Sequence, residues 1–177
     1  MSGITITEER RESVDFSAVN HTEDLVLVIH KQSDGKTFED YKNANVGVTT
    51  GTYAATIIRD VFPDATVKEF ASIPDMVLAM TQGKIDITLE DVSYYTCMKW
   101  EGMNVDRLEE PYTTTDFGIA FKKGENAQLR EQMNAFIAKI KENGEYDRLQ
   151  EKWFGDTEPT ECADPSTLMG ENGTLKV

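Results

Sequence analysis

Short apolar runs alternate with helically spaced apolar residues along most of this chain. The run Leu25–Ile29 is continuous and rich in β-branched residues, which is typical of a strand buried on both faces. Further strands are predicted at 46–48, 65–70, 85–89 and 117–121. Helical spacing predicts helices from Ala54, after Ser72, after Asp91, from Asn126 and after Gly144. Strands that alternate with helices predict an α/β fold whose parallel or mixed sheet is covered on both faces.

The segment 45–62 combines a strand, a turn and a helix. The strand contains Val46 and Val48, and the turn is Thr49–Thr52, with the sequence Thr-Thr-Gly-Thr. Such a turn directs backbone N–H groups and hydroxyls at one point, and the helix dipole adds partial positive charge there, which suits a carboxylate. The alternative is an ordinary strand–helix corner, capped by threonine and relaxed by glycine. No Gly-Lys-Ser/Thr follows the turn, so it is not a P-loop.

Two charged residues complement this turn. Asp91 follows a predicted strand, and ligands of such sheets bind beyond the carboxyl ends of the strands. Asp91 could accept an ammonium while the turn holds a carboxylate, so the pair fits an α-amino acid; alternatively, Asp91 is a plain helix N-cap. Arg10 could clamp the carboxylate with two parallel hydrogen bonds, or it could be one solvated member of the charged run 8–12.

Composition narrows the classes of partner. The chain has 177 residues, of which 39% are hydrophobic, enough for one domain or two small lobes. Its 32 acidic and 18 basic residues give a net charge of −14, which argues against nucleic acid and against an anionic membrane surface. No apolar run is long enough to span a membrane, and the N-terminus is not a signal peptide. Cys97 and Cys162 could form one disulfide or stay reduced.

Catalytic and metal-binding patterns are weak. His21 and His30 are the only histidines, and neither lies near a Ser or Cys nucleophile pattern. The carboxylate group Asp86, Glu90 and Asp91 is a weak indication of acid–base chemistry in so acidic a chain. No HExxH, EF-hand or CxxC pattern is present. The sequence therefore predicts a binding protein without catalytic residues, metal or cofactor.

Several segments together resemble a known family. Gly3–Arg10 (GITITEER), followed by Val14–Ser17 (VDFS), resembles the Thr-x-x-Arg and Val-Asp-Phe-Ser signature of the extracellular solute-binding proteins of family 3, the polar amino-acid receptors of ABC importers. VGVTTGT at 46–52, GKIDITLED at 83–91 and GEYDRLQEKWFG at 144–155 are similar to three further landmarks of this family, in the same order. The resemblance covers residues 3–155.

The resemblance implies a periplasmic-binding-protein-like type II fold, in which two α/β lobes close on the ligand about two hinge strands. This chain would hold one complete lobe, residues 35–115, and a partial lobe with the hinge strands, residues 1–34 and 116–155. Residues 156–177 would form a linker and the start of a following domain.

The resemblance also implies site residues. The arginine that matches Arg10 clamps the ligand carboxylate, and the aspartate that matches Asp91 takes the α-ammonium. The matching turn and the residue that matches Thr5 assist the arginine. The predicted ligand-binding residues are Thr5, Arg10, Thr50, Gly51, Thr52 and Asp91.

Two departures from the family shape the expectations. The chain lacks the first-lobe segment that precedes the Thr-x-x-Arg motif in the family, and it has Ser17-Ala-Val-Asn-His21 where the family has Ser-Asp-Pro-Tyr. We therefore expect a piece of a longer protein, with a signal or anchor in the missing part. The tail Glu171–Val177 resembles the start of such a domain, so we also expect two solute-binding domains in tandem. With half of the cleft absent, weak or no binding by the isolated chain and its self-association are expected.

The function that these patterns predict is an extracytoplasmic domain that captures a polar amino acid for an ABC importer, whose permease lies in the same system or the same chain. The alternative is the same fold serving as the ligand-sensing extracellular domain of a membrane receptor.

Overall fold

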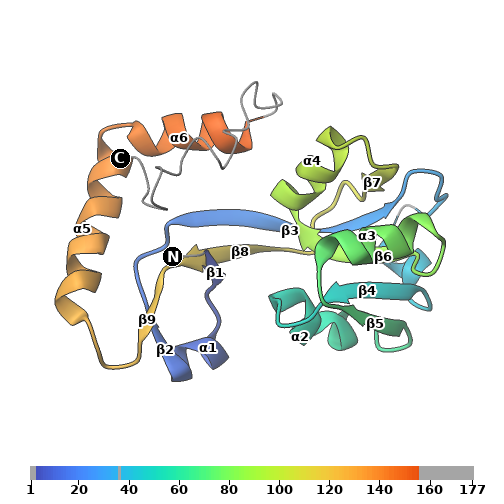
Figure 1. The fold of residues 1–177 in the computed structure, drawn as a ribbon, viewed down its shortest axis with the longest axis horizontal. Coiled ribbons are helices and arrows are strands. Elements are labelled where there is room, and N and C mark those ends of the chain that lie inside the picture. The colour runs from blue at the N-terminus through green and yellow to red at the C-terminus, as the bar shows by residue number, and fades with distance from the viewer. Residues whose placement is uncertain (1–2, 36, 156–177) are drawn as a thin grey trace, which may run out of the picture. The chain divides into compact units, whose positions relative to one another are not determined.

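The computed structural model describes residues 3–35 and 37–155 (Figure 1). They fall into two compact units, the first ending at Ile137 and the second beginning at Ala138. The strands are β1 (Ile4–Thr5), β2 (Val14–Phe16), β3 (His21–His30), β4 (Asn45–Thr49), β5 (Thr66–Phe70), β6 (Ile87–Asp91), β7 (Val105–Arg107), β8 (Thr113–Gly118) and β9 (Ala120–Lys122). The helices are α1 (Glu8–Ser13), η1 (Phe38–Tyr41), α2 (Tyr53–Val61), α3 (Ile73–Thr81), α4 (Val92–Trp100), α5 (Ala127–Glu142) and α6 (Glu145–Phe154).

The first unit is built on a mixed sheet in the order β1-β8-β3-β6-β4-β5, with β7 also paired to β3. β4 is parallel to β5 and β6, whereas β3 is antiparallel to β6, β7 and β8. Figure 1 shows β3 and β8 running side by side. The prediction of an α/β fold with a mixed sheet is therefore confirmed.

Apolar residues fill both faces of this sheet. Because side chains alternate along a strand, Leu25 and Leu27 of β3 pack with Ile58 of α2 on one face, and Val26 and Val28 pack against α3 and α4 on the other. This alternation explains why the run at 25–29 is continuously apolar.

Local signals place the helix starts correctly. Thr7 Oγ1 accepts the Arg10 N–H at 3.1 Å, and Ser72 Oγ accepts the Asp75 N–H at 3.3 Å, as expected for N-caps. Gly144, predicted to break the last helical region, lies between α5 and α6 with a φ of 77°. The first helix start matters for the site, because α1 carries Arg10.

The predicted strand 117–121 is wrong in one respect, because it is interrupted at Ile119. The Ile119 N–H donates to Ser17 Oγ at 3.0 Å, and the Ile119 carbonyl accepts the Ser17 N–H at 2.9 Å. The chain thereby leaves the large sheet after β8 and pairs with β2 as β9. The strand predicted at 85–89 is observed at Ile87–Asp91, and the short β1 and β7 were not predicted.

Residues 156–177 lie outside the described residues, and so do Cys162 and the linker and domain start that were predicted there. Among residues 3–35 and 37–155, no helix has both the length and the apolar character needed to cross a membrane.

Gly47 of β4 offers a test of this packing. A methyl group added there would lie 2.9 Å from Met76 Cγ and would also meet Ile85 Cδ1, and both neighbours are fully buried. Gly47→Ala should therefore lower the free energy of unfolding by about 1–3 kcal/mol, measured by chemical denaturation. Gly3→Ala is the control, because its methyl group would meet Phe117 at an ordinary 3.6 Å. Equal stability of the two variants would contradict this account of the core.

Candidate ligand-binding pocket

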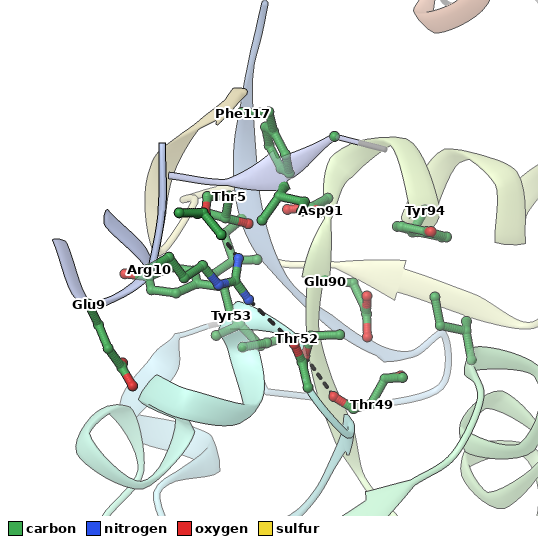
Figure 2. A pocket seen from close by; sticks show the side chains of 18 of the residues that line it. Thr5, Glu9, Arg10, Thr49, Thr52, Tyr53, Glu90, Asp91, Tyr94 and Phe117 are labelled. Atoms are coloured by element: carbon green, nitrogen blue, oxygen red, sulfur yellow. Dashed lines mark hydrogen bonds between the residues drawn. The ribbon is translucent and has the colours of Figure 1, made fainter. Parts of the chain in front are cut away.

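A pocket of about 670 Å³ opens in the first unit, where α1, the turn after β4, and the end of β6 meet (Figure 2). Five of the six predicted site residues line it: Thr5, Arg10, Gly51, Thr52 and Asp91. The sixth, Thr50, is not among its lining residues. Thr52 and Asp91 lie 39 positions apart in the chain, and the parallel pairing of β4 and β6 brings their strand ends to one edge of the sheet.

Arg10 projects from α1 into this pocket. Its Nη1 donates to the Thr5 carbonyl at 2.9 Å, and its Nη2 donates to the Gly51 carbonyl at 3.4 Å (Figure 2). A guanidinium carries five N–H donors, so these two bonds hold it in place and leave donors for a ligand carboxylate. Thr5 and Gly51 thus contribute backbone carbonyls that orient Arg10.

The Thr/Gly turn uses more of its own donors than the sequence predicted. The Thr50 N–H donates to the Phe70 carbonyl at 2.9 Å, and the Thr52 N–H donates to the Thr49 carbonyl at 3.2 Å. Thr52 Oγ1 donates to the same Thr49 carbonyl at 2.7 Å and accepts the Ala55 N–H at 3.3 Å, so Thr52 is a helix cap.

The first residues of α2 supply the donors that the turn itself lacks. Tyr53 and Ala54 both line the pocket. The N–H groups of the first helical turn have no partner within the helix, and they carry the positive end of its dipole. This end of the pocket therefore still suits a small anionic group.

Asp91 ends β6 and precedes α4, yet its side chain makes no capping hydrogen bond. Glu23 of β3 has that role instead, because its Oε1 accepts the Ser93 N–H at the start of α4. The other oxygen of Glu23 lies 3.1 Å from His21 Nε2, which fixes the carboxylate. Asp91 is therefore the N-cap residue of α4 by position, but its side chain does not cap the helix, and its carboxylate faces the pocket (Figure 2).

The surroundings of Asp91 make its negative charge unfavourable in the absence of a ligand. Burial, and secondarily the nearby Glu23 carboxylate, raise the pKa of Asp91 to about 6, while His21 acts in the opposite direction. A cation brought to this site would offset that penalty. Strongly shifted carboxyl groups that line clefts are typical of functional sites.

Glu90 is a lining residue that the sequence did not single out for binding. The residue is buried, with an exposed fraction of 6%, and its carboxylate accepts a hydrogen bond from Thr88 Oγ1 at 3.4 Å. Burial, with Asp91 as a second cause, raises the pKa of Glu90 to about 8. Tyr94 of α4 and Phe117 of β8 also line the pocket. One feature of the sequence could have pointed to Glu90 as a binding residue: it is a carboxylate next to Asp91, at the end of a buried strand.

No group of three or more His, Cys, Asp or Glu side chains within residues 3–35 and 37–155 is arranged to hold a metal ion. Cys97 is exposed on α4.

Comparison with known proteins assigns the chain to a family. The sequence profile of the bacterial extracellular solute-binding proteins, family 3, matches residues 1–156. The chain belongs to this family.

Two relatives illustrate the similarity. The ABC transporter glutamine-binding protein GlnH of Bacillus subtilis is 34% identical over 152 residues, which cover 85% of this chain and 55% of that protein. The ABC transporter arginine-binding protein 1 of Escherichia coli is 29% identical over 161 residues, covering 87% of this chain and 65% of that protein. The chain thus spans between half and two thirds of the length of these relatives.

Solved structures agree with the fold. The crystal structure of a mutant arginine-binding protein, ArgBP, from T. maritima superposes with a TM-score of 0.78 at 31% identity, covering 86% of this chain and 67% of that one. An ancestral arginine-binding protein bound to arginine gives a TM-score of 0.77 at 31% identity, covering 86% and 69%. The predicted periplasmic-binding-protein-like type II fold, with partial lobes, is therefore confirmed.

The buried Glu90 predicts a pH dependence of stability. Its folded pKa of about 8 lies above the ordinary value of 4.5, so its contribution to stability is present at low pH and is lost as pH rises through 8. Each pKa unit of difference corresponds to about 1.4 kcal/mol. Glu90→Gln should therefore be more stable relative to the wild type at pH 8.5 than at pH 5, by chemical denaturation.

The control for this experiment is Glu8→Gln on α1, because the Glu8 side chain is 95% exposed. Its stability relative to the wild type should change little between the two pH values. If Glu90→Gln behaved in the same way as Glu8→Gln, Glu90 would not be a buried carboxyl group with a raised pKa.

Proposed function

We propose that this chain is part of an extracytoplasmic solute-binding protein that captures an α-amino acid for an ABC importer. The observation that carries the proposal is that Arg10 and Asp91 line the same pocket. The Asp91 side chain makes no capping hydrogen bond to α4, and Arg10 donates to the Thr5 carbonyl rather than to a residue of α1. Arg10 is a cation that keeps N–H donors available for a ligand. Asp91 is a carboxylate whose negative charge is unfavourable in the absence of a ligand cation.

The carboxylate of the amino acid is assigned to Arg10 and the start of α2. Arg10 is pre-oriented by the Thr5 and Gly51 carbonyls, so little side-chain freedom is lost when a ligand binds. The N–H groups of Tyr53 and Ala54 add donors at the positive end of the α2 dipole. Thr50 has no direct role in this assignment, and Thr52 acts by capping α2.

The ammonium of the amino acid is assigned to Asp91. A charged hydrogen bond between ammonium and carboxylate is stronger inside a partly buried pocket than in water. Glu23 keeps this carboxylate available because it provides the cap of α4 itself.

The pairing of β3 supports the predicted division into lobes. Residues 21–25 of β3 pair with β8, and residues 25–29 of the same strand pair with β6. We propose that β3 and β8 are the two hinge strands, that residues 35–115 form one lobe, and that residues 1–34 and 116–155 belong to the other. Residues 156–177 would connect to a following domain.

The relatives support the partner and the location. The relatives described above are named as ABC transporter binding proteins, and the family is described as extracellular. We therefore propose that the protein works outside the cytoplasm with an ABC permease. One similar structure, at 28% identity and a TM-score of 0.79, is an ancestral amino-acid-binding protein called a precursor of cyclohexadienyl dehydratase. For this chain we favour binding, because Arg10 and Asp91 line the same pocket and suit the carboxylate and the ammonium of a zwitterion.

The test is a titration of the whole chain with L-amino acids, monitored by nuclear magnetic resonance. Ligand concentrations extend to the millimolar range so that weak binding is also detected. Asp91→Asn and Arg10→Lys should each weaken binding roughly ten- to hundredfold, because each removes a charged or bidentate hydrogen bond. N-acetylated and decarboxylated forms of the same amino acid should fail to bind, since each lacks one of the two groups.

Two variants serve as matched controls. Arg11→Lys changes the neighbouring arginine of α1, which pairs with Glu8 rather than lining the pocket. Asp24→Asn changes a carboxylate of β3 that accepts a hydrogen bond from Thr114, a role that the amide oxygen can keep. Undiminished binding by Asp91→Asn, or binding of the N-acetylated ligand with equal affinity, would refute the proposed function.

A further inference from the structure

Glu90 and Thr49 form a second polar group in the pocket, which the proposed binding of an α-amino acid leaves unused. Thr49 ends β4 and Glu90 lies near the end of β6, and these strands are parallel, with Val46 opposite Ile87 and Gly47 opposite Thr88. The same register, continued along both strands, would place Thr49 opposite Glu90, and both residues line the pocket. Figure 2 shows both residues on the side of the pocket away from Arg10.

Both side chains have unused capacity for hydrogen bonds. Thr49 Oγ1 is buried and has no hydrogen-bond partner among the described residues. Glu90 is buried, and in the part of the chain that the structure describes its hydrogen-bond donor is Thr88 Oγ1, which also lies 3.2 Å from Met76 Sδ. Because buried polar groups are normally satisfied, this pair indicates a missing partner.

The charges of the pocket show what kind of partner fits. Its charged lining side chains are Arg10 and the carboxylates of Glu9, Glu90 and Asp91. The two ends of an amino acid match Arg10 and Asp91, and Glu9 is exposed to solvent. Glu90 therefore remains as a buried carboxyl group for which no described cation forms an ion pair.

We infer that Glu90 and Thr49 receive the positively charged side-chain terminus of the ligand, so that the protein selects a basic amino acid such as arginine or lysine over neutral ones. This inference rests on the proposed function and names the ligand class for the same pocket. A guanidinium or ammonium donates to the Glu90 carboxylate and to Thr49 Oγ1, while the ring of Tyr94 forms part of the adjacent wall. The positive charge of the ligand stabilises the ionised Glu90 carboxylate and so compensates for the hydration that this group loses on burial.

The protonation of Glu90 strengthens the contrast between ligands. The titratable or charged groups that share its pocket are Asp91 on the same strand, Tyr94 on α4, Tyr53 on α2, and Arg10 and Glu9 on α1. With its pKa raised to about 8, Glu90 is largely protonated at pH 7 without ligand, and a ligand cation drives its ionisation. Arginine binding should therefore release a proton and strengthen between pH 7 and 8, whereas binding of a neutral amino acid should not.

The experiment compares L-arginine with L-citrulline, its neutral isostere, on the whole chain. The wild type should bind arginine roughly ten- to hundredfold more tightly than citrulline, and Glu90→Gln should bring this ratio near one. Thr49→Val should weaken arginine binding about two- to tenfold. It should not lower stability, because the hydroxyl has no partner in the ligand-free protein. Glu8→Gln, which removes an exposed charge outside the pocket, should keep the wild-type ratio.

The outcomes separate this inference from the proposed function. If citrulline or glutamine binds as tightly as arginine to the wild type, the basic-ligand inference fails while the amino-acid site stands. An unchanged ratio in folded Glu90→Gln also overturns it. If no amino acid binds to the wild type up to millimolar concentration, the groups of this pocket do not suffice for binding, and both the proposed site and its specificity fail for this chain.

Discussion

The hydrogen bond from the Ser93 N–H to Glu23 is the contact on which the pocket depends. The start of α4 needs an acceptor, and Asp91 stands at the position where a capping residue is normally found. Glu23 reaches across from the adjacent strand β3 and provides that acceptor, held in turn by His21. The carboxylate of Asp91 therefore remains available to a ligand.

The same arrangement places three carboxyl groups close to one strand end. Burial raises the pKa of both Glu90 and Asp91; the Asp91 charge adds to the effect on Glu90, and the Glu23 charge adds to the effect on Asp91. Binding sites commonly retain such unfavourable local electrostatics, because a ligand of opposite charge relieves them. Here the structure provides two such positions, Asp91 for an ammonium and Glu90 with Thr49 for a basic side chain, and one cation, Arg10, for a carboxylate.

Local sequence signals were reliable where the responsible contacts are local. Ser72 caps the helix that was predicted to follow it, the segment 45–62 forms a strand, a turn and a helix, and the apolar run at 25–29 is a strand buried on both faces. The family resemblance added the placement of Arg10 and Asp91 around one site, which spacing alone left open.

Long-range contacts account for what the sequence did not predict. Glu23 is 70 positions from Ser93, so nothing near Asp91 indicates that its capping role has been taken over. The Thr50 N–H of the turn at 49–52 donates to the Phe70 carbonyl of the neighbouring strand and is not available to a ligand. The Ile119 N–H donates to Ser17 Oγ, which interrupts the strand predicted at 117–121. Thr49 and Glu90 line one pocket because β4 and β6 run parallel, which the 41 positions between them in the sequence do not reveal.

The most direct measurement is a carbon-detected nuclear magnetic resonance titration of the Asp91 side-chain carboxyl, with and without an amino acid. The account predicts a midpoint of about 6 in the ligand-free protein and a clear fall when the ligand ammonium is present. An ordinary midpoint that the ligand leaves unchanged would contradict the assignment of Asp91 as the ammonium acceptor.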